Sequence, residues 1–229
     1  MILTTIIHRP YVFAFLISFL VIGFLNRGAG RTFLFLFLGY SIAFLSEFSS
    51  IQNGFPYGMY HYVYENMRGE LMLGGVPVWD SLSYSFMAYA GYEMADYFLG
   101  ERWKIPAAAL LMVLLDVVAD PLAVRGERWF LGRIFFYPDG GAYFGVPLSN
   151  FAGWLLVASM ILLTYRFLEK SLFRNPPPRR FPLAGPLFYW GIVGFNLAVT
   201  FWIGEIAIGI TGLILHTLTA GLLFKARSR

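Results

Sequence analysis

Two aspartates, Asp116 and Asp120, end a run of residues that otherwise has the composition of a membrane-spanning helix. A spacing of four places both carboxylates on one helical face, about one turn apart. Pro121 follows directly, and a residue before proline is disfavoured in the helical region, so we expect Asp120 at a helix end or kink. Ionised carboxylates are costly at bilayer depth and commonly serve a function there. The alternative is a pair at a helix end that headgroup water solvates.

Three more polar residues could act with this pair, because each lies near the end of a neighbouring predicted span. Glu47 ends the span before the first long loop, Asp80 begins the span after it, and Asn150 begins the span after the second long loop. In the topology given below, all of them lie toward one membrane face. We therefore take Asp116, Asp120, Glu47 and Asp80 as candidate catalytic residues, with Asn150 as a polar residue beside them.

The elements that must position these residues are membrane helices. Of the 229 residues, 58% are hydrophobic and 13% are charged, a balance that few soluble domains have. Several apolar runs approach or exceed the roughly 20 residues that cross a bilayer. We predict an all-α polytopic membrane protein with about seven transmembrane helices in one bundle, a single domain of residues 1–229. The predicted spans are 11–25, 33–48, 76–99, 105–120, 148–167, 183–203 and 205–224.

The basic residues predict the orientation of this bundle, because lysine and arginine favour the cytoplasmic side. Twelve of the 17 fall on one side of the predicted spans and five on the other. The N-terminus is then outside and the C-terminus in the cytoplasm, in the cell (inner) membrane. The net charge of +4 is explained by this asymmetry, and we predict no binding of nucleic acid.

A weak internal repeat accompanies the long loops. Gly75-Val76-Pro77 and Gly145-Val146-Pro147 each follow a Gly- and Tyr-rich loop, and each precedes a helix with a polar residue in its first turn. This pattern predicts two parallel helical hairpins, about 33–100 and 105–170. The alternatives are chance and shared helix-entry chemistry.

Several classes of site are excluded by what the sequence lacks. With no cysteine, it has no disulfide, no thiolate nucleophile and no cysteine zinc site. The three histidines, His8, His61 and His216, are scattered without the spacing of a helix metal site. There is no Gly-x-Gly-x-x-Gly motif and no phosphate-binding loop. We predict neither a metal site nor a cofactor.

Three segments together resemble a known family: residues 54–60 (GFPYGMY), 116–121 (DVVADP) and 143–154 (YFGVPLSNFAGW). The sequence resembles the carotenoid-biosynthesis integral membrane family over about residues 40–225. Its characterised members are carotenoid 1,2-hydratases, of the bisanhydrobacterioruberin type among others. The resemblance implies cofactor-free addition of water to the terminal C1=C2 double bond of an acyclic carotenoid. It implies a lipophilic carotenoid substrate and membrane lipid as partners, together with other enzymes of the carotenoid pathway.

Such a hydration needs an acid, a base and a shielded pocket. Protonation at C2 leaves a tertiary cation at C1, water attacks this cation, and a base accepts the proton of the water. One carboxyl group held neutral by an apolar site and a second that stays ionised would divide these roles. Aromatic rings can stabilise the cation by roughly 0.5–2 kcal/mol. The candidate substrate-binding residues are Tyr57, Tyr60, Trp79, Tyr143, Asn150 and Trp154. For the tyrosines and tryptophans, the alternative is an interfacial belt.

Two other functions remain open from the sequence. The Asp-x-x-x-Asp spacing resembles the diphosphate-magnesium motif of intramembrane prenyltransferases, although that family needs two such motifs and only one is present. A non-enzymatic carotenoid-binding or transport protein is the second alternative, because intramembrane acids also couple proton movement. A retinal photoreceptor is disfavoured, since Lys104, Lys170 and Lys225 all lie at predicted helix ends.

Overall fold

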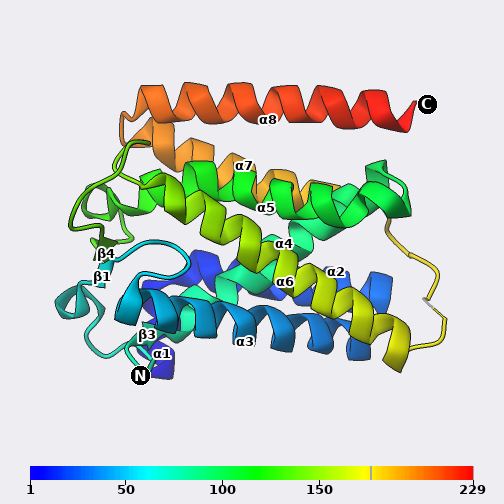
Figure 1. Ribbon diagram of the computed structural model, residues 1–229, viewed down its shortest axis with the longest axis horizontal. Coiled ribbons are helices and arrows are strands. Elements are labelled where there is room, and N and C mark those ends of the chain that lie inside the picture. Colours follow the sequence, from blue (N-terminus) through cyan, green and yellow to red (C-terminus); the bar gives the residue numbers. More distant parts are fainter. Residues whose placement is uncertain (176, 229) are drawn as a thin grey trace.

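The protein is a bundle of long helices capped at one end by two loops (Figure 1). The computed structural model describes residues 1–175 and 177–228. In these residues the helices are α1 (Ile2–His8), α2 (Pro10–Arg27), α3 (Ala29–Asn53), α4 (Val78–Phe98), α5 (Glu101–Ala123), α6 (Leu148–Leu172), α7 (Ala184–Trp202) and α8 (Ile206–Arg227). The short strands are β1 (His61–Tyr62), β2 (Met72–Leu73), β3 (Val76–Pro77) and β4 (Phe135–Phe136).

The predicted all-α membrane bundle is confirmed. Each predicted span corresponds to one of the helices α2 to α8, and six of these helices, α2, α3, α5, α6, α7 and α8, are long and apolar enough to cross a membrane among the described residues. The remaining long helix, α4, is less apolar. It packs against every other long helix of the described chain, so its side chains meet protein rather than lipid.

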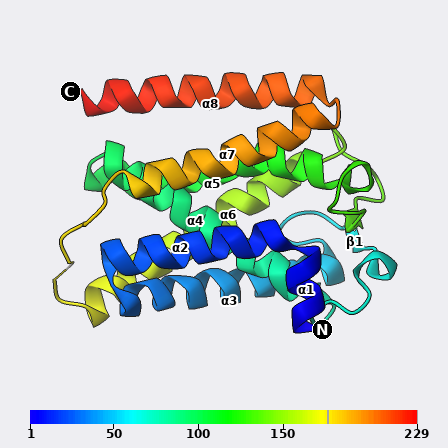
Figure 2. The same ribbon diagram turned by 180° about the vertical axis from the view of Figure 1, so that it is seen from behind.

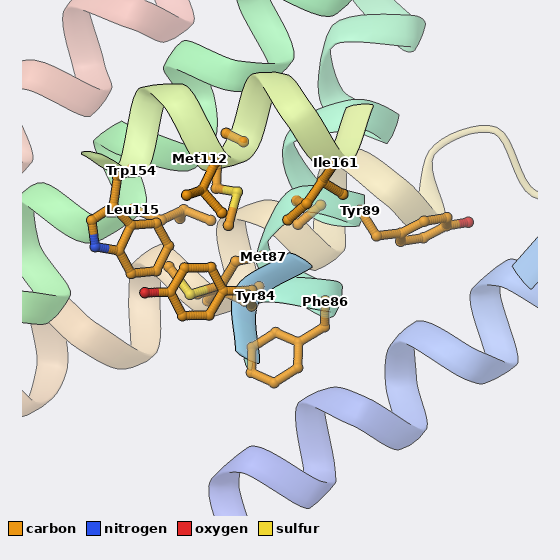
Figure 3. Close-up of a cluster of buried hydrophobic side chains, with 14 of the residues drawn as sticks. Tyr84, Phe86, Met87, Tyr89, Met112, Leu115, Trp154 and Ile161 are labelled. Atoms are coloured by element: carbon orange, nitrogen blue, oxygen red, sulfur yellow. The ribbon is translucent and has the colours of Figure 1, made fainter. Parts of the chain in front are cut away.

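The central position of α4 depends on close packing. Its residues Tyr84, Phe86, Met87 and Tyr89 are buried with side chains of α5 and α6 (Figure 3). At Gly91 the backbones of α4 and α5 come so close that a Cβ would lie 2.7 Å from the Ala108 carbonyl oxygen. Because only glycine permits this approach, the sequence places a residue without a side chain at the tightest crossing of these two helices.

Two loops, 54–77 and 124–147, cover one end of the bundle, on the left in Figure 1. They are joined because β1 pairs antiparallel with β4, with His61 opposite Phe136 and Tyr62 opposite Phe135. A second short pair, β2 with β3, lies within the first loop. This pairing holds the two loops together above the ends of α3, α4, α5 and α6.

The end of α5 differs slightly from the prediction. The helix continues through Pro121 to Ala123, and the Val124 amide donates to the Asp120 carbonyl oxygen at 2.9 Å. Asp120 therefore lies in the last turn of α5 and not at its end. Beyond the proline the helix continues for less than one turn, and at its C-terminal end the Arg125 guanidinium donates to the Pro121 carbonyl oxygen at 2.9 Å.

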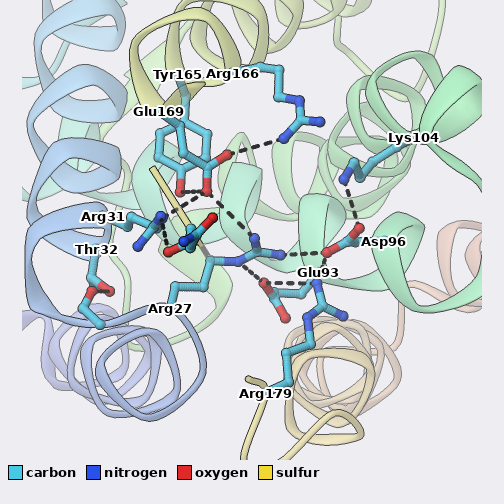
Figure 4. A network of polar contacts seen from close by, with 12 residues as sticks. Arg27, Arg31, Thr32, Glu93, Asp96, Lys104, Tyr165, Arg166, Glu169 and Arg179 are labelled. Atoms are coloured by element: carbon cyan, nitrogen blue, oxygen red, sulfur yellow. Dashed lines mark hydrogen bonds and ion pairs between the residues drawn. The ribbon is translucent and has the colours of Figure 1, made fainter. Parts of the chain in front are cut away.

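At the opposite end, the helices are joined by a buried network of ion pairs (Figure 4). Arg27 of α2 pairs with Glu93 and with Asp96 of α4, the latter at 2.6 Å. Lys104 of α5 also binds Asp96, at 2.8 Å, and Arg27 lies 4.0 Å from Glu169 of α6. This network ties four helices together far from the two loops.

The helices α3 and α4 form one hairpin, and α5 and α6 form a second that runs in the same direction (Figure 1). The second helix of each hairpin begins directly after its Gly-Val-Pro segment, α4 at Val78 and α6 at Leu148. A common origin of the two hairpins stays a prediction. The N-terminus and the C-terminus lie at opposite ends of the bundle (Figure 1).

Candidate active site

Four acidic side chains from three helices gather at the end of the bundle beneath the two loops. Glu47 comes from α3, Asp80 from the first turn of α4, and Asp116 and Asp120 from the last turns of α5. Glu47 is 2% exposed and Asp116 is not exposed at all. These acids line two adjoining cavities, and Asp80 and Asp120 lie in the wall that the cavities share.

The first, which we name the apolar cavity, has a volume of about 110 Å³. It is bounded by α2, α4, α5 and α7, by Trp154 of α6 and by the second loop. Asp80, Asp116 and Asp120 lie at its inner end, and most of its other lining residues are aromatic or aliphatic. Its shape and chemistry suit the tip of a hydrocarbon chain.

The second, which we name the polar cavity, is smaller, at about 40 Å³. Its lining residues are rich in hydroxyl, carboxyl and amide groups: Glu47, Tyr57, Tyr60, Asp80, Tyr84, Asp120, Phe135, Tyr137, Asn150 and Trp154. A buried water molecule needs two to four polar partners, and this cavity supplies them.

One amide joins the two aspartates of α5. The Asn150 Nδ2 atom donates to Asp116 Oδ2 at 2.9 Å and to Asp120 Oδ2 at 2.7 Å. Asn150 lies in the first turn of α6 and is 2% exposed. The other oxygen of Asp116, Oδ1, is buried without a hydrogen-bond partner in the described residues. Asp116 is thus held by one oxygen, which leaves the second free to act.

The remaining acids bind hydroxyl groups. Ser81 of α4 donates to Glu47. Tyr62 donates to Asp80 Oδ2 at 2.8 Å, and Tyr137 donates to Asp120 Oδ2 at 3.4 Å. Burial, and then the nearby carboxylates, raise the pKa of Tyr62 and of Tyr137 well above the usual range of a phenol. Both phenols therefore stay protonated and remain donors.

Two aromatic rings form the shared wall beside the acids. Trp154 of α6 and Tyr84 of α4 stack with ring centroids 4.2 Å apart and planes within 7°. Tyr57 packs against both rings, and its hydroxyl group lies 2.8 Å from Ser46 Oγ. This stack places flat π surfaces next to Asp120 and Asp80.

The structure brings most of the predicted site residues together. Glu47, Asp80, Asp116, Asp120, Tyr57, Tyr60, Asn150 and Trp154 all line one or both cavities. Trp79 lines the apolar cavity, but its indole nitrogen donates to Glu70 at 2.6 Å and its ring lies beneath the Arg9 guanidinium. The indole nitrogen of Trp79 is therefore already hydrogen-bonded to the neighbouring Arg9–Glu70 ion pair.

Tyr143 is the predicted residue that the structure does not bring to the site. It lines neither cavity and packs against Phe144 and Phe151. The cause is the tight turn in which Tyr143 and Val146 exchange backbone hydrogen bonds, since this turn sets the ring against the start of α6. Proximity in sequence to Asn150 was a misleading signal here.

Sequence reasoning also missed residues that the fold places at the site. Tyr137, Phe135 and Ser81 touch the cavities or the acids, and Asn196 of α7 lines the apolar cavity. Tyr137 and Phe135 reach the acids through the pairing of two-residue strands, which has no readable sequence pattern. Asn196 could have been found, because a lone amide in an apolar helix is a recognisable signal.

The fold and this site define a class: a multi-pass helical membrane protein with an acidic cavity between its helices. Within that class, the chain belongs to the carotenoid biosynthesis protein family, whose model matches residues 7–218. It is 31% identical over 192 residues to a bisanhydrobacterioruberin hydratase of Haloarcula japonica, a match that covers 79% of this chain. The chain spans 59% of the length of that relative. No solved structure matches. The family predicted from the three sequence segments is confirmed.

Proposed function

We propose that this protein hydrates the terminal C1=C2 double bond of an acyclic carotenoid without a cofactor. The observation that carries the proposal is the position of Asp120 and Asp80 in a wall between an apolar cavity and a polar one. A hydration joins a hydrocarbon to water, and these two cavities suit the two reactants. The family of the chain and the name of its Haloarcula relative support the same reaction.

In this proposal, Asp116 is the acid. It lines the apolar cavity and not the polar one, and its Oδ1 atom has no partner among the described residues. A carboxyl group that carries its proton on Oδ1 can transfer it to C2 of an alkene in the apolar cavity. The π electrons form the new C–H bond, the tertiary cation forms at C1, and Asp116 becomes a carboxylate that the Asn150 amide stabilises.

Asp120 is the base. It faces both cavities, so a water molecule in the polar cavity can lie between its carboxylate and C1 of the substrate. As the water oxygen bonds to C1, Asp120 accepts a proton, and the product is a tertiary alcohol. Transfer of this proton to Asp116, which shares the Asn150 amide, restores the starting state. Glu47 and Asp80 add negative potential that favours the cation.

The stacked rings of Trp154 and Tyr84 supply the remaining stabilisation. A cation held at an aromatic face gains roughly 0.5–2 kcal/mol. Their place in the shared wall, beside Asp120, is where the C1 cation would form. Apart from its two carboxyl groups, the shared wall is aromatic. Water can therefore reach the cation only from the polar cavity.

We further propose that the protein lies in the cell (inner) membrane as one domain, with its N-terminus outside and its C-terminus in the cytoplasm. Of the sixteen lysines and arginines in the described residues, eleven lie on the helix ends and the loop at the end that carries the ion-pair network, which supports this orientation. The acids then lie toward the outer leaflet. Membrane lipid and other enzymes of the carotenoid pathway are the proposed partners.

The test is co-expression in a bacterial host that makes acyclic carotenoids, with mass analysis of the pigments. The wild-type protein is expected to add the mass of one water at one or both ends. Asp116→Asn and Asp120→Asn should remove this product while the protein remains in the membrane. Asp139→Asn, which changes an exposed loop aspartate, is the matched control. Normal hydration by both site variants, or a product that needs magnesium and releases diphosphate, would refute the proposal.

A further inference from the structure

A carotenoid is a long, rigid polyene, so only its tip can lie in a cavity of about 110 Å³ and the rest must leave the bundle. We infer that the polyene passes sideways into the membrane between α2 and α7, through a seam of four rings: Tyr11, Phe15, Phe130 and Phe195. This inference rests on the proposed function, because it concerns how the same substrate reaches the same acids.

The apolar cavity extends from the acids to both helices of this seam. Tyr11 and Phe15 of α2 and Phe195 of α7 line the cavity that Asp116 and Asp120 also line. In the view from behind, α2 and α7 lie at the front of the bundle with α4 behind them (Figure 2). The seam is thus the side wall of the cavity that faces away from α6.

Only aromatic and aliphatic contacts close the seam. Tyr11 stacks on Phe195 with centroids 5.4 Å apart, and Phe15 meets Phe195 edge-on at 5.5 Å. Phe130, from the second loop, lies 5.6 Å from Tyr11 and is 51% exposed. In the described residues no hydrogen bond or ion pair joins α2 to α7. Rings held by stacking alone can turn aside by rotation about their side-chain bonds, without movement of the helix backbones.

Several other contacts in the bundle are closed by backbone. Gly91 of α4 meets the Ala108 carbonyl of α5, and Gly39 of α3 lies so close to Ser85 of α4 that an added Cβ would be 2.8 Å from its Cα. Gly153 of α6 packs in the same way against Pro56. Such contacts cannot open without moving whole helices, whereas the ring seam can open by rotation of side chains. Flat rings that part also offer faces on which a polyene can stack.

The first experiment closes the seam reversibly. Because the protein has no cysteine, Phe15→Cys with Phe195→Cys introduces one reactive pair, which a short reducible bis-thiosulfonate reagent can bridge. The matched control pair is Phe24→Cys with Phe33→Cys, whose rings lie 5.3 Å apart between α2 and α3 at the other end of the bundle. Hydration by membranes that carry the seam pair should fall at least tenfold when bridged and recover on reduction. The control pair should hydrate equally in both states.

Equal hydration by the bridged and the reduced seam pair would overturn the inference and leave the proposed function intact. A second measurement does not depend on activity. It follows the rate at which N-ethylmaleimide labels Tyr11→Cys, and the control is Phe48→Cys, in α3 at the same end of the bundle. Lycopene in the membrane should slow labelling at position 11 by several-fold and leave position 48 unchanged. Unchanged labelling at both positions would overturn the inference, even if the protein hydrates nothing and the proposed function has failed.

Discussion

Replacing Asn150 by leucine would test whether one amide organises the reacting acids. The side chain of Asn150 is buried and donates to Asp116 at 2.9 Å and to Asp120 at 2.7 Å. A hydrogen bond to a charged group contributes about 1.5–3 kcal/mol. Leucine has a similar volume and no donor, so Asn150→Leu removes both bonds without opening a large cavity.

The expected loss of activity depends on how much the two Asn150 hydrogen bonds stabilise the transition state of the rate-limiting step. When Asp116 gives up its proton, the new carboxylate depends on the amide for stabilisation. If one of the two bonds strengthens in the transition state, losing it should lower the rate by about 10- to 100-fold, since each 1.4 kcal/mol is a factor of ten. The assay is the initial rate of alcohol formation in isolated membranes, divided by the amount of protein there.

Asn66→Leu is the matched control. Asn66 also donates an amide hydrogen bond, to the Arg133 carbonyl oxygen at 2.8 Å, but it lies on an exposed loop away from the acids. Its variant should hydrate at the wild-type rate. If Asn150→Leu is present in the membrane at the normal level and hydrates within a factor of two of wild type, the assignment of Asp116 and Asp120 as the reacting pair is refuted.

Three further predictions follow from the same structure. Arg27→Met should lower the free energy of unfolding in detergent by about 3–5 kcal/mol, because it leaves buried carboxylates unpaired, and Arg102→Met, at an exposed position, should change it little. Burial raises the pKa of Tyr60, Tyr62 and Tyr137 above that of tyrosines in the unfolded chain, so their contribution to stability should be constant below about pH 10 and be lost as the pH rises above it. A thermal midpoint that rises between pH 9 and pH 11 would contradict this. Treating membranes with EDTA should leave hydration unchanged, whereas a loss that magnesium restores would point to the prenyltransferase alternative.

The helices were predictable because the bilayer imposes a length and an apolar composition on whatever crosses it. That constraint identified the helices α2, α3 and α5 to α8, and the prolines and glycines of the loops bounded them. Helix α4 was also predicted, with Pro77 at its start, although it is the least apolar. Helix α4 can be less apolar because of its place in the tertiary structure. It is surrounded by protein, and its serines and tyrosines face other helices.

The site was predictable only in part. Acids in apolar helices are few, so Glu47, Asp80, Asp116 and Asp120 could be selected from their types and positions alone. The selection of rings was less secure, because tyrosine and tryptophan are common at both membrane interfaces. Tyr143 was selected for its proximity in sequence to Asn150 and lines neither cavity, while Tyr137 was missed although its hydroxyl group reaches Asp120.

By itself, the sequence determined that the chain crosses a membrane several times, that Asp116 and Asp120 share one face of a helix, and that acids and long loops meet at one membrane face. These properties follow from hydropathy and helical periodicity, which are local. Only the tertiary structure decided that Asn150 bridges the two aspartates, that Tyr137 reaches one of them, and that two cavities of opposite character share a wall at the acids. The physical reason is that these relations depend on which helix faces meet, and side-chain packing between distant segments leaves no periodic pattern in the chain.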